Sequence, residues 1–248
     1  VAPNVKDFDL GRYHSAIISG DNDELLFAGN SNYGQIATRA YPASNLTTFT
    51  KVNVTGIGKI ACGAYHTMFV PSSSASYNSG EVYTHGHNGF GQLGRPTAGA
   101  SSTAIPSNSS MRFDATNVAE ISAGSEHSAV LKTDGNLYVF GKNREGQLGR
   151  GNKIDDNLNL TSPVTPFTNV SKASLGNLNS AYIDTSDKLY TFGGNYYYQL
   201  GDGTTTLRTV PTDVFDNIKD VSLGSYHTLM LSGSTTTGNL YGFGYNYS

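Results

Sequence analysis

A short glycine-containing segment recurs five times along the 248 residues, and its spacing constrains the fold more than any other feature. Four copies read Gly-x-x-His, and the fourth along the chain has Asn179 in place of the histidine. The anchor glycines lie 48 to 61 residues apart, at Gly11, Gly63, Gly124, Gly176 and Gly224. A self-similar period near 50 residues is typical of β-propellers and solenoids.

Within each repeat, short runs of alternating residues predict β-strands. Ser128–Lys132 and Asn136–Phe140 carry the β-branched and aromatic residues that strands favour. Between them, Thr133-Asp-Gly-Asn136 predicts a hairpin with a type I′ turn. No segment shows a sustained helical period, so we expect an all-β protein.

Prolines indicate where each repeat ends. Pro106, Pro163 and Pro211 each lie in the later part of a repeat. Proline is tolerated at the edge of a sheet, so the last strand of each repeat should be an edge strand. Four-stranded antiparallel sheets packed face to face around an axis form a β-propeller, which is the predicted fold.

We expect one β-propeller domain over 1–248, and the last of its repeats is incomplete because Gly244–Ser248 enters the repeat motif and stops before Gly-Gln-Leu-Gly. The simplest interpretation is about five blades of a seven-bladed ring in a longer chain. A compact five-bladed ring, or an oligomer that closes across chains, is the alternative. The predicted repeats are approximately 4–55, 56–116, 117–168, 169–216 and 217–248.

A second motif, Gly-x-Asn-x-x-Gly-Gln-Leu-Gly, follows the predicted hairpins. It is clearest at Gly86–Gly94 and Gly141–Gly149, whereas the fourth repeat has Tyr198 for the glycine before Gln199, and the first has Ser31 for the asparagine. Together with Gly-x-x-His, the motif resembles the regulator of chromosome condensation repeat. That resemblance implies a β-propeller, usually of seven blades. It says little about function, because one propeller scaffold supports many activities.

Composition excludes some partners. The net charge is −3, only 14% of the residues are charged, and no basic run occurs, so nucleic acid is not an expected partner. No apolar stretch approaches the roughly 20 residues of a membrane helix, so membrane insertion is not expected. The single cysteine, Cys62, rules out an intrachain disulfide.

Chemically reactive residues form no recognisable catalytic set. The repeat histidines occupy equivalent places in successive blades, which favours hydrogen bonds between neighbouring strands over a metal cluster: His14, His66, His127 and His227. His85 and His87 lack a third ligand. Cys62 is expected in the core, and Asp155 and Asp156 in a solvated loop. We therefore predict no catalytic residues, no bound metal, no cofactor and no enzyme activity.

Two repeat positions beside the turns carry mostly aromatic residues. They precede the repeat histidine and the Gly-Gln pair, so they should gather on one face of the propeller. Tyrosine is enriched at protein interfaces, although packing between blades is the alternative. The candidate protein-binding residues are Tyr13, Tyr33, Tyr65, Phe90, Glu126, Glu145, Tyr197 and Tyr226.

Sequons for N-glycosylation are no more frequent than this Asn-, Ser- and Thr-rich composition produces by chance. Three of them, at Asn45, Asn108 and Asn159, lie in loops between repeats, where a glycan is tolerated. Their placement and the low charge favour a secreted or cell-surface protein. A cytoplasmic protein is the alternative.

These observations favour a non-enzymatic binding or structural module whose partner is another protein or a second copy of itself, so a homo-oligomer is possible. The resemblance suggests an alternative, a guanine-nucleotide exchange factor for a small GTPase, although no exchange residues can be mapped onto this chain. Ultraviolet-B photoreceptors of the same fold sense light through tryptophan, and this chain has none. That role is therefore not expected.

Overall fold

Eighteen β-strands form in the part of the chain that the structure describes, and no helix forms there. The structure is a computed structural model that describes residues 4–36, 45–72, 77–96, 102–107, 111–156, 164, 166–234 and 237–246. The strands are β1 (Val5–Leu10), β2 (His14–Ser19), β3 (Glu24–Gly29), β4 (Leu46–Lys51), β5 (Ile57–Cys62), β6 (His66–Pro71), β7 (Tyr83–His87), β8 (Ser102–Ser107), β9 (Val118–Ala123), β10 (His127–Lys132), β11 (Leu137–Gly141), β12 (Val170–Leu175), β13 (Asn179–Asp184), β14 (Leu189–Gly193), β15 (Arg208–Phe215), β16 (Ile218–Leu223), β17 (His227–Ser232) and β18 (Asn239–Gly244).

The strands pair into five antiparallel sheets in chain order, which we number I to V. Sheets I (β1–β4), II (β5–β8) and IV (β12–β15) have four strands, and sheets III (β9–β11) and V (β16–β18) have three in the described residues. The isolated bridge between Leu137 and Phe167 lies beside β11. Each sheet falls within one predicted repeat, and the predicted all-β propeller fold is confirmed. With no helix in the described residues, none there could span a membrane.

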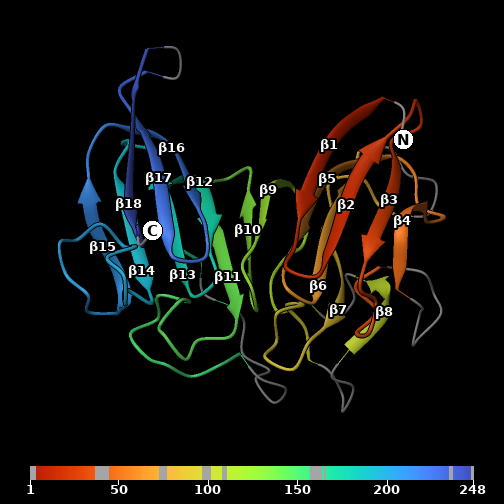
Figure 1. Ribbon diagram of the computed structural model, residues 1–248, viewed down its shortest axis with the longest axis horizontal. Coiled ribbons are helices and arrows are strands. Elements are labelled where there is room, and N and C mark those ends of the chain that lie inside the picture. The colour runs from red at the N-terminus through yellow and green to blue at the C-terminus, as the bar shows by residue number, and fades with distance from the viewer. Residues whose placement is uncertain are drawn as a thin grey trace.

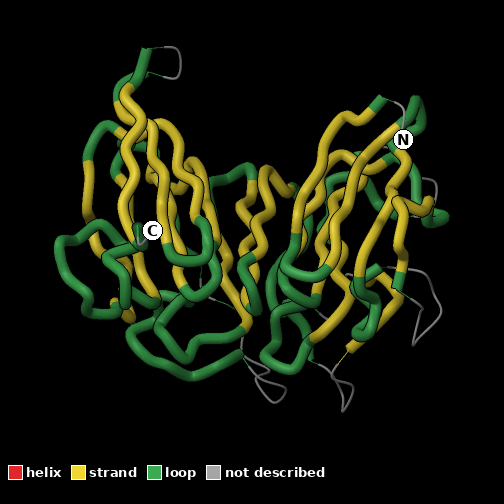
Figure 2. The backbone as a smooth tube through the Cα atoms, in the orientation of Figure 1, coloured by secondary structure: helices red, strands yellow, loops and turns green. Residues whose placement is uncertain are grey.

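The sheets pack face to face in an open arc, with β1 at one end and β16–β18 at the other (Figures 1 and 2). The compact five-bladed ring is therefore wrong, whereas closure as seven blades stays a prediction. Apolar side chains at the two ends are exposed: Phe8 by 63% and Leu240 by 70%. Their repeat equivalents Ile60 and Leu137 are buried between sheets.

The outermost strands and the hairpins agree with the sequence interpretation except in one detail. Pro106 and Pro211 lie in the edge strands β8 and β15, as predicted, and Pro163 is outside the described residues. At the β10–β11 hairpin only Gly135 has a positive φ, of 80°, whereas a type I′ turn needs two such residues. Bonds from Gly135 N to Lys132 O and from Lys132 N to Asn136 O close a three-residue loop instead. The type I′ prediction is wrong.

A hydrogen-bond relay joins neighbouring sheets through the repeat histidines. His14 Nε2 lies 2.7 Å from the Thr67 hydroxyl of the next sheet, and that hydroxyl donates to the Gln35 carbonyl over 2.8 Å. Because the Thr67 hydroxyl donates its hydrogen to the Gln35 carbonyl, its oxygen must accept a hydrogen bond from the Nε2–H of His14. The same relay runs through His66, Ser128 and Gln92, and through His127, Ser180 and Gln147. The predicted structural role of these three histidines is confirmed.

The anchor glycines bring the sheets close at the axis. A Cβ on Gly63 would lie 2.7 Å from the Gly124 carbonyl oxygen and 2.1 Å from the His66 ring, so no side chain fits there. Backbone bonds cross the same gap, as from Ala64 N to Ser125 O. In the Gly-x-x-His motif, the glycine therefore lets the backbones of neighbouring sheets approach closely, and the histidine forms the relay to the next sheet.

Burial keeps the relay histidines neutral. It lowers the pKa of His14 to about 4 and the pKa of His66 and His127 to about 3. The Nδ1 atoms of the three rings have no hydrogen-bond partner in the described structure, so a proton there would be a buried charge without an acceptor.

Sheet IV interrupts the relay. Thr228 of sheet V still donates to the Gln199 carbonyl, but Asn179 stands where the histidine is expected. The side-chain amide of Asn179 is buried and finds no hydrogen-bond partner in the described structure. The junction between sheets IV and V therefore lacks a donor that the other junctions have.

The relay makes stability depend on pH. Each histidine has a lower pKa folded than unfolded, so acidification protonates the unfolded chain first and destabilises the fold below about pH 6.5. We expect each of the three to cost about 2 kcal/mol between about pH 7 and about pH 5. Urea unfolding at both pH values measures the loss.

Two reciprocal variants serve as controls, since sheet IV shows that asparagine fits the position. His127→Asn should remove about 2 kcal/mol of the pH-dependent loss. Asn179→His should add a donor to Thr228, raise stability near neutral pH by about 1 kcal/mol and steepen the pH dependence. An unchanged pH profile in both variants would contradict the assignment.

Candidate functional site

Three repeat positions meet on one face of the propeller at every junction between sheets. The first position precedes the Gly-Gln pair of one sheet. The second precedes the relay residue of the next sheet, and the third follows the glycine at the end of that sheet's third strand, which is Gly86, Gly141, Gly193 or Gly244. Junctions are named by their sheets: I–II holds Tyr33, Tyr65 and His87; II–III holds Phe90, Glu126 and Lys142; III–IV holds Glu145, Leu178 and Gly194; IV–V holds Tyr197, Tyr226 and Tyr245.

Motif residues and backbone fix these positions irrespective of their side chains. The side-chain oxygen of the motif glutamine accepts a hydrogen bond from the backbone N–H of the first position. At junction III–IV, Gln147 Oε1 accepts this bond from Glu145 N over 2.9 Å. The N–H of the third position donates to the carbonyl of the second, as Lys142 N does to Glu126 O. The repeat therefore presents three side chains at each junction in a constant frame.

Junction I–II is an aromatic cluster. Tyr33 meets both Tyr65 and His87 edge to face, each with ring centroids 4.9 Å apart. Tyr13 of sheet I stacks on Tyr65 at 4.7 Å, and the Arg12 guanidinium lies over the Tyr13 ring. The hydrogen bond between Tyr13 and Tyr65 raises the pKa of Tyr65 to about 12. The cluster is uncharged apart from Arg12 on its edge.

Junction IV–V repeats the aromatic arrangement with tyrosines alone. The Tyr197 ring meets Tyr226 and Tyr245 edge to face, with centroids 5.1 Å and 4.8 Å apart. Tyr197, Tyr226 and Tyr245 are 40%, 38% and 49% exposed. Part of each ring is therefore exposed to solvent.

The two central junctions carry charge. At II–III, Lys142 lies over the Phe90 ring and forms an ion pair with Glu126. At III–IV, Glu145 Oε2 accepts a hydrogen bond from the Tyr196 hydroxyl over 2.5 Å, and this bond raises the pKa of Tyr196. The face thus runs from aromatic through charged to aromatic junctions.

All eight candidate protein-binding residues lie at these junctions. Tyr33, Tyr65 and Phe90 lie around His87, which is 6.0 Å from Phe90 by ring centroids, and Tyr13 stacks on Tyr65. Glu126 and Glu145 lie at the central junctions, and Tyr197 and Tyr226 join Tyr245. Their binding role stays a prediction. The sequence interpretation missed the third position, which aligning the residue after each third-strand glycine would have shown.

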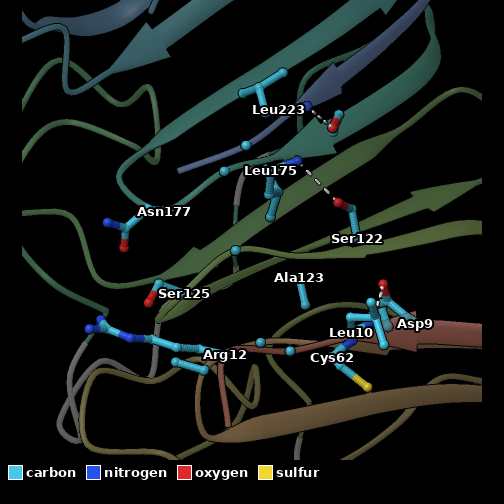
Figure 3. Close-up of a pocket in the computed structure, with 18 of the residues that line it drawn as sticks. Asp9, Leu10, Arg12, Cys62, Ser122, Ala123, Ser125, Leu175, Asn177 and Leu223 are labelled. Carbon is cyan, nitrogen blue, oxygen red and sulfur yellow. Dashed lines mark hydrogen bonds between the residues drawn. The ribbon is translucent and has the colours of Figure 1, made fainter. Parts of the chain in front are cut away.

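A cavity of about 700 Å³ runs along the axis and is lined by the innermost strands (Figure 3). Its polar groups already join the sheets. Asp9 Oδ2 accepts from Cys62 N over 2.6 Å, and Ser122 Oγ from Leu175 N over 3.1 Å. Ser174 repeats the contact with Leu223 N. These three side chains on the cavity wall therefore serve contacts between neighbouring sheets.

Cys62 is not placed for chemistry. It is buried in the core between sheets I and II, as predicted. Burial, and then the nearby Asp9 carboxylate, raise the pKa of the Cys62 thiol well above its ordinary value. The thiol stays protonated, and a protonated thiol is a poor nucleophile.

The remaining histidine and acidic residues make structural contacts, and one of them corrects an expectation. Within the described residues, no three His, Cys, Asp or Glu side chains gather as a metal site. His87 Nδ1 instead accepts a bond from Gln92 Nε2 over 2.7 Å. The expectation of solvated loop carboxylates is wrong for Asp156, which is 1% exposed and paired with Arg112 and Arg150. It links the loops of sheets II and III.

Of the three candidate glycosylation sites, the structure describes only Asn45. It is exposed immediately before β4, and its Oδ1 accepts a bond from Ser31 N over 3.3 Å. Asn108 and Asn159 lie outside the described residues.

The chain belongs to the regulator of chromosome condensation (RCC1) repeat family. Matches to this repeat cover residues 79–131, 134–183 and 186–231, more than half of the chain, and a second description of the same repeat matches residues 118–147. Each of the three segments begins at or just before the third strand of one sheet and ends in the second strand of the next. One sequence repeat therefore spans the junction at which the face positions meet.

Characterised relatives share the repeat over part of their length. The ultraviolet-B receptor UVR8 of Arabidopsis thaliana is 32% identical over 77% of this chain and 41% of its own length. The human X-linked retinitis pigmentosa GTPase regulator is 32% identical over 94% of this chain and 27% of its length. The chain thus spans less than half of either protein.

A solved structure shows the same fold at low identity. Prp20p of Saccharomyces cerevisiae, described with its binding to Gsp1p and histones, has a TM-score of 0.78 and 21% identity over 97% of this chain and 57% of its own. Members of the family thus include propellers that bind proteins. The prediction that this chain has no enzyme activity stays a prediction.

Proposed function

We propose that the protein is a non-enzymatic interaction module that binds a protein partner through the junction face. The observation that carries the proposal is the pair of partly exposed aromatic clusters at junctions I–II and IV–V. Tyrosine rings offer large contact area at low entropic cost and are common anchors in protein interfaces. The constant backbone frame holds these rings in place before binding, which lowers the cost of association.

Site-specific replacement tests this proposal. A photo-crosslinking residue at Tyr197 should capture the partner, whereas one at Phe49, an exposed aromatic of edge strand β4, should not. With the captured protein purified, Tyr197→Ala with Tyr226→Ala should weaken binding at least about tenfold, as expected for hot-spot aromatics.

The control variant is Phe49→Ala, which removes a similarly exposed ring away from the junction face. Calorimetry should give it wild-type affinity. Equal affinity for the double variant and the wild type would refute the use of this face. Light scattering decides whether the partner is a second copy, since a monomer at high concentration excludes self-assembly.

A small GTPase is the second candidate partner, because a GTPase regulator is among the relatives that match most of the chain. If the protein acts on such a partner, it should speed release of fluorescent GDP from one member of a GTPase panel by at least about tenfold. The Tyr197→Ala and Tyr226→Ala double variant should lose that effect. Unchanged release across the panel would exclude exchange activity on the GTPases tested.

We also propose that the protein is secreted or displayed at the cell surface. Exposure of both Asn45 and Thr47 of the sequon supports this, because the asparagine must be accessible for a glycan to be attached. Protein from its native source should lose mass on enzymatic removal of N-glycans, and Asn45→Gln should lower the glycan mass. A mass equal to that of the bare polypeptide would contradict the proposal.

A further inference from the structure

The residues that directly follow the anchor glycines surround one end of the axial cavity. We call this set the inner ring: Arg12, Ala64, Ser125, Asn177 and Ser225. A Cβ on each of the first four anchor glycines would lie only 2.2 to 2.7 Å from the carbonyl oxygen of the next anchor, so successive members of the ring are neighbours. Figure 3 shows Arg12, Ser125 and Asn177 at one end of the cavity, with Asp9 further along it.

The polar side chains of the inner ring are not used to join the sheets, unlike those deeper in the cavity. Within the described residues, the side chains of Ser125, Asn177 and Ser225 form no hydrogen bond. Arg12 lies over the Tyr13 ring and takes part in none of the ion pairs there. This end of the cavity therefore presents four polar side chains to a ligand.

The charge at this end of the cavity is positive. Arg12 is the only lysine or arginine among the described residues that line the cavity. The acidic lining residue, Asp9, is occupied, because its two carboxylate oxygens accept bonds from Leu10 N over 2.9 Å and from Cys62 N over 2.6 Å. Guanidinium, hydroxyl and amide groups together donate several hydrogen bonds, and a carboxylate accepts up to about four. The inner ring therefore fits a carboxylate, which also pairs with guanidinium in a bidentate geometry.

The inner ring is continuous with the junction face. Each of its members directly precedes a second face position, as Arg12 precedes Tyr13's neighbour in the stack, Tyr65, by way of Tyr13 itself. Tyr226, which belongs to the aromatic cluster of junction IV–V, also lines the cavity. A partner seated on both clusters would cover Arg12, and a covered cation is costly unless the partner supplies an anion.

We propose that the inner ring receives an aspartate or glutamate side chain of the protein partner. Its carboxylate pairs with Arg12 and accepts hydrogen bonds from Ser125 and Asn177. The inference rests on the proposed protein-binding function and identifies the partner's chemistry at the axis. The aromatic clusters at I–II and IV–V provide contact area, and this charge pair fixes the partner's register.

N-acetyl-glutamate α-methylamide is the probe that tests the inner ring, with N-acetyl-glutamine α-methylamide as its neutral match. In ¹⁵N-labelled protein of the full chain, the glutamate probe at millimolar concentration should shift the backbone amide signals of Ser125 and Asn177 and the Nε–H signal of Arg12 saturably. The glutamine probe should bind at least about tenfold more weakly, because it lacks the charge-assisted bonds.

Two variants should abolish the shifts for different reasons. Arg12→Gln removes the cation, and Asn177→Asp adds a carboxylate of the chain's own to the inner ring, where it repels the probe. Lys51→Gln removes the same charge as Arg12→Gln, but at an ion pair with Glu24 in sheet I, so it should bind the probe like wild type. Unchanged melting temperatures confirm that all three variants fold.

Absence of saturable shifts, equal shifts with the glutamine probe, or glutamate binding that survives in either Arg12→Gln or Asn177→Asp would overturn the proposal. Failure here is distinguishable from failure of the proposed function. If the probe does not bind the inner ring but the tyrosine variants still weaken the partner, only the inner-ring assignment is wrong. If the probe binds and the tyrosine variants have no effect, the aromatic face is wrong instead.

Discussion

The hydrogen bond from a serine or threonine hydroxyl to a glutamine carbonyl of the preceding sheet is the interaction that all four junctions share, and at three of them a histidine completes it as a relay. The relay connects three repeat positions of two sheets, at His66, Ser128 and Gln92 in one instance, and every member is buried. A buried hydroxyl without partners is costly, so each sheet accepts its neighbour only in the register that completes the chain. Close approach at the anchor glycines then follows, since any side chain there would push the relay apart.

Because the relay and the motif glutamine act through backbone carbonyls and N–H groups, they constrain little of the exposed face. Gln35, Gln92, Gln147 and Gln199 each hold the first face position by its N–H, whatever side chain stands there. Tyrosine, phenylalanine and glutamate all occur in that place. The fold therefore does not depend on the side chains exposed on the junction face. Those side chains are aromatic at some junctions and charged at others, although the sheets pack in the same way.

Repeat spacing, strand alternation and edge prolines were enough to predict the fold, because they follow from the period of the backbone. The eight face residues could be located for the same reason. The burial of Asp156 could not be predicted from the sequence, because it depends on ion pairs with Arg112 and Arg150, which lie in two different loops. Likewise the hairpin at Gly135 closes with three residues, where an Asp-Gly pair alone cannot distinguish the possible turns. Contacts between loops are set by the tertiary arrangement and leave no local pattern.

Sheet IV departs from the repeat at two positions, one in the interior and one on the surface. Asn179 lies within the relay, and its buried amide without partners costs stability and gives nothing to the surface. Tyr198 occupies a left-handed position, φ 62°, where the other turns have glycine, at a cost of about 1 kcal/mol. Unlike Asn179, it is exposed, next to Tyr196 and Tyr197 on the face. Tyr198 therefore adds an aromatic side chain to the surface at a turn where the repeat has glycine, whereas Asn179 changes only the interior between sheets IV and V.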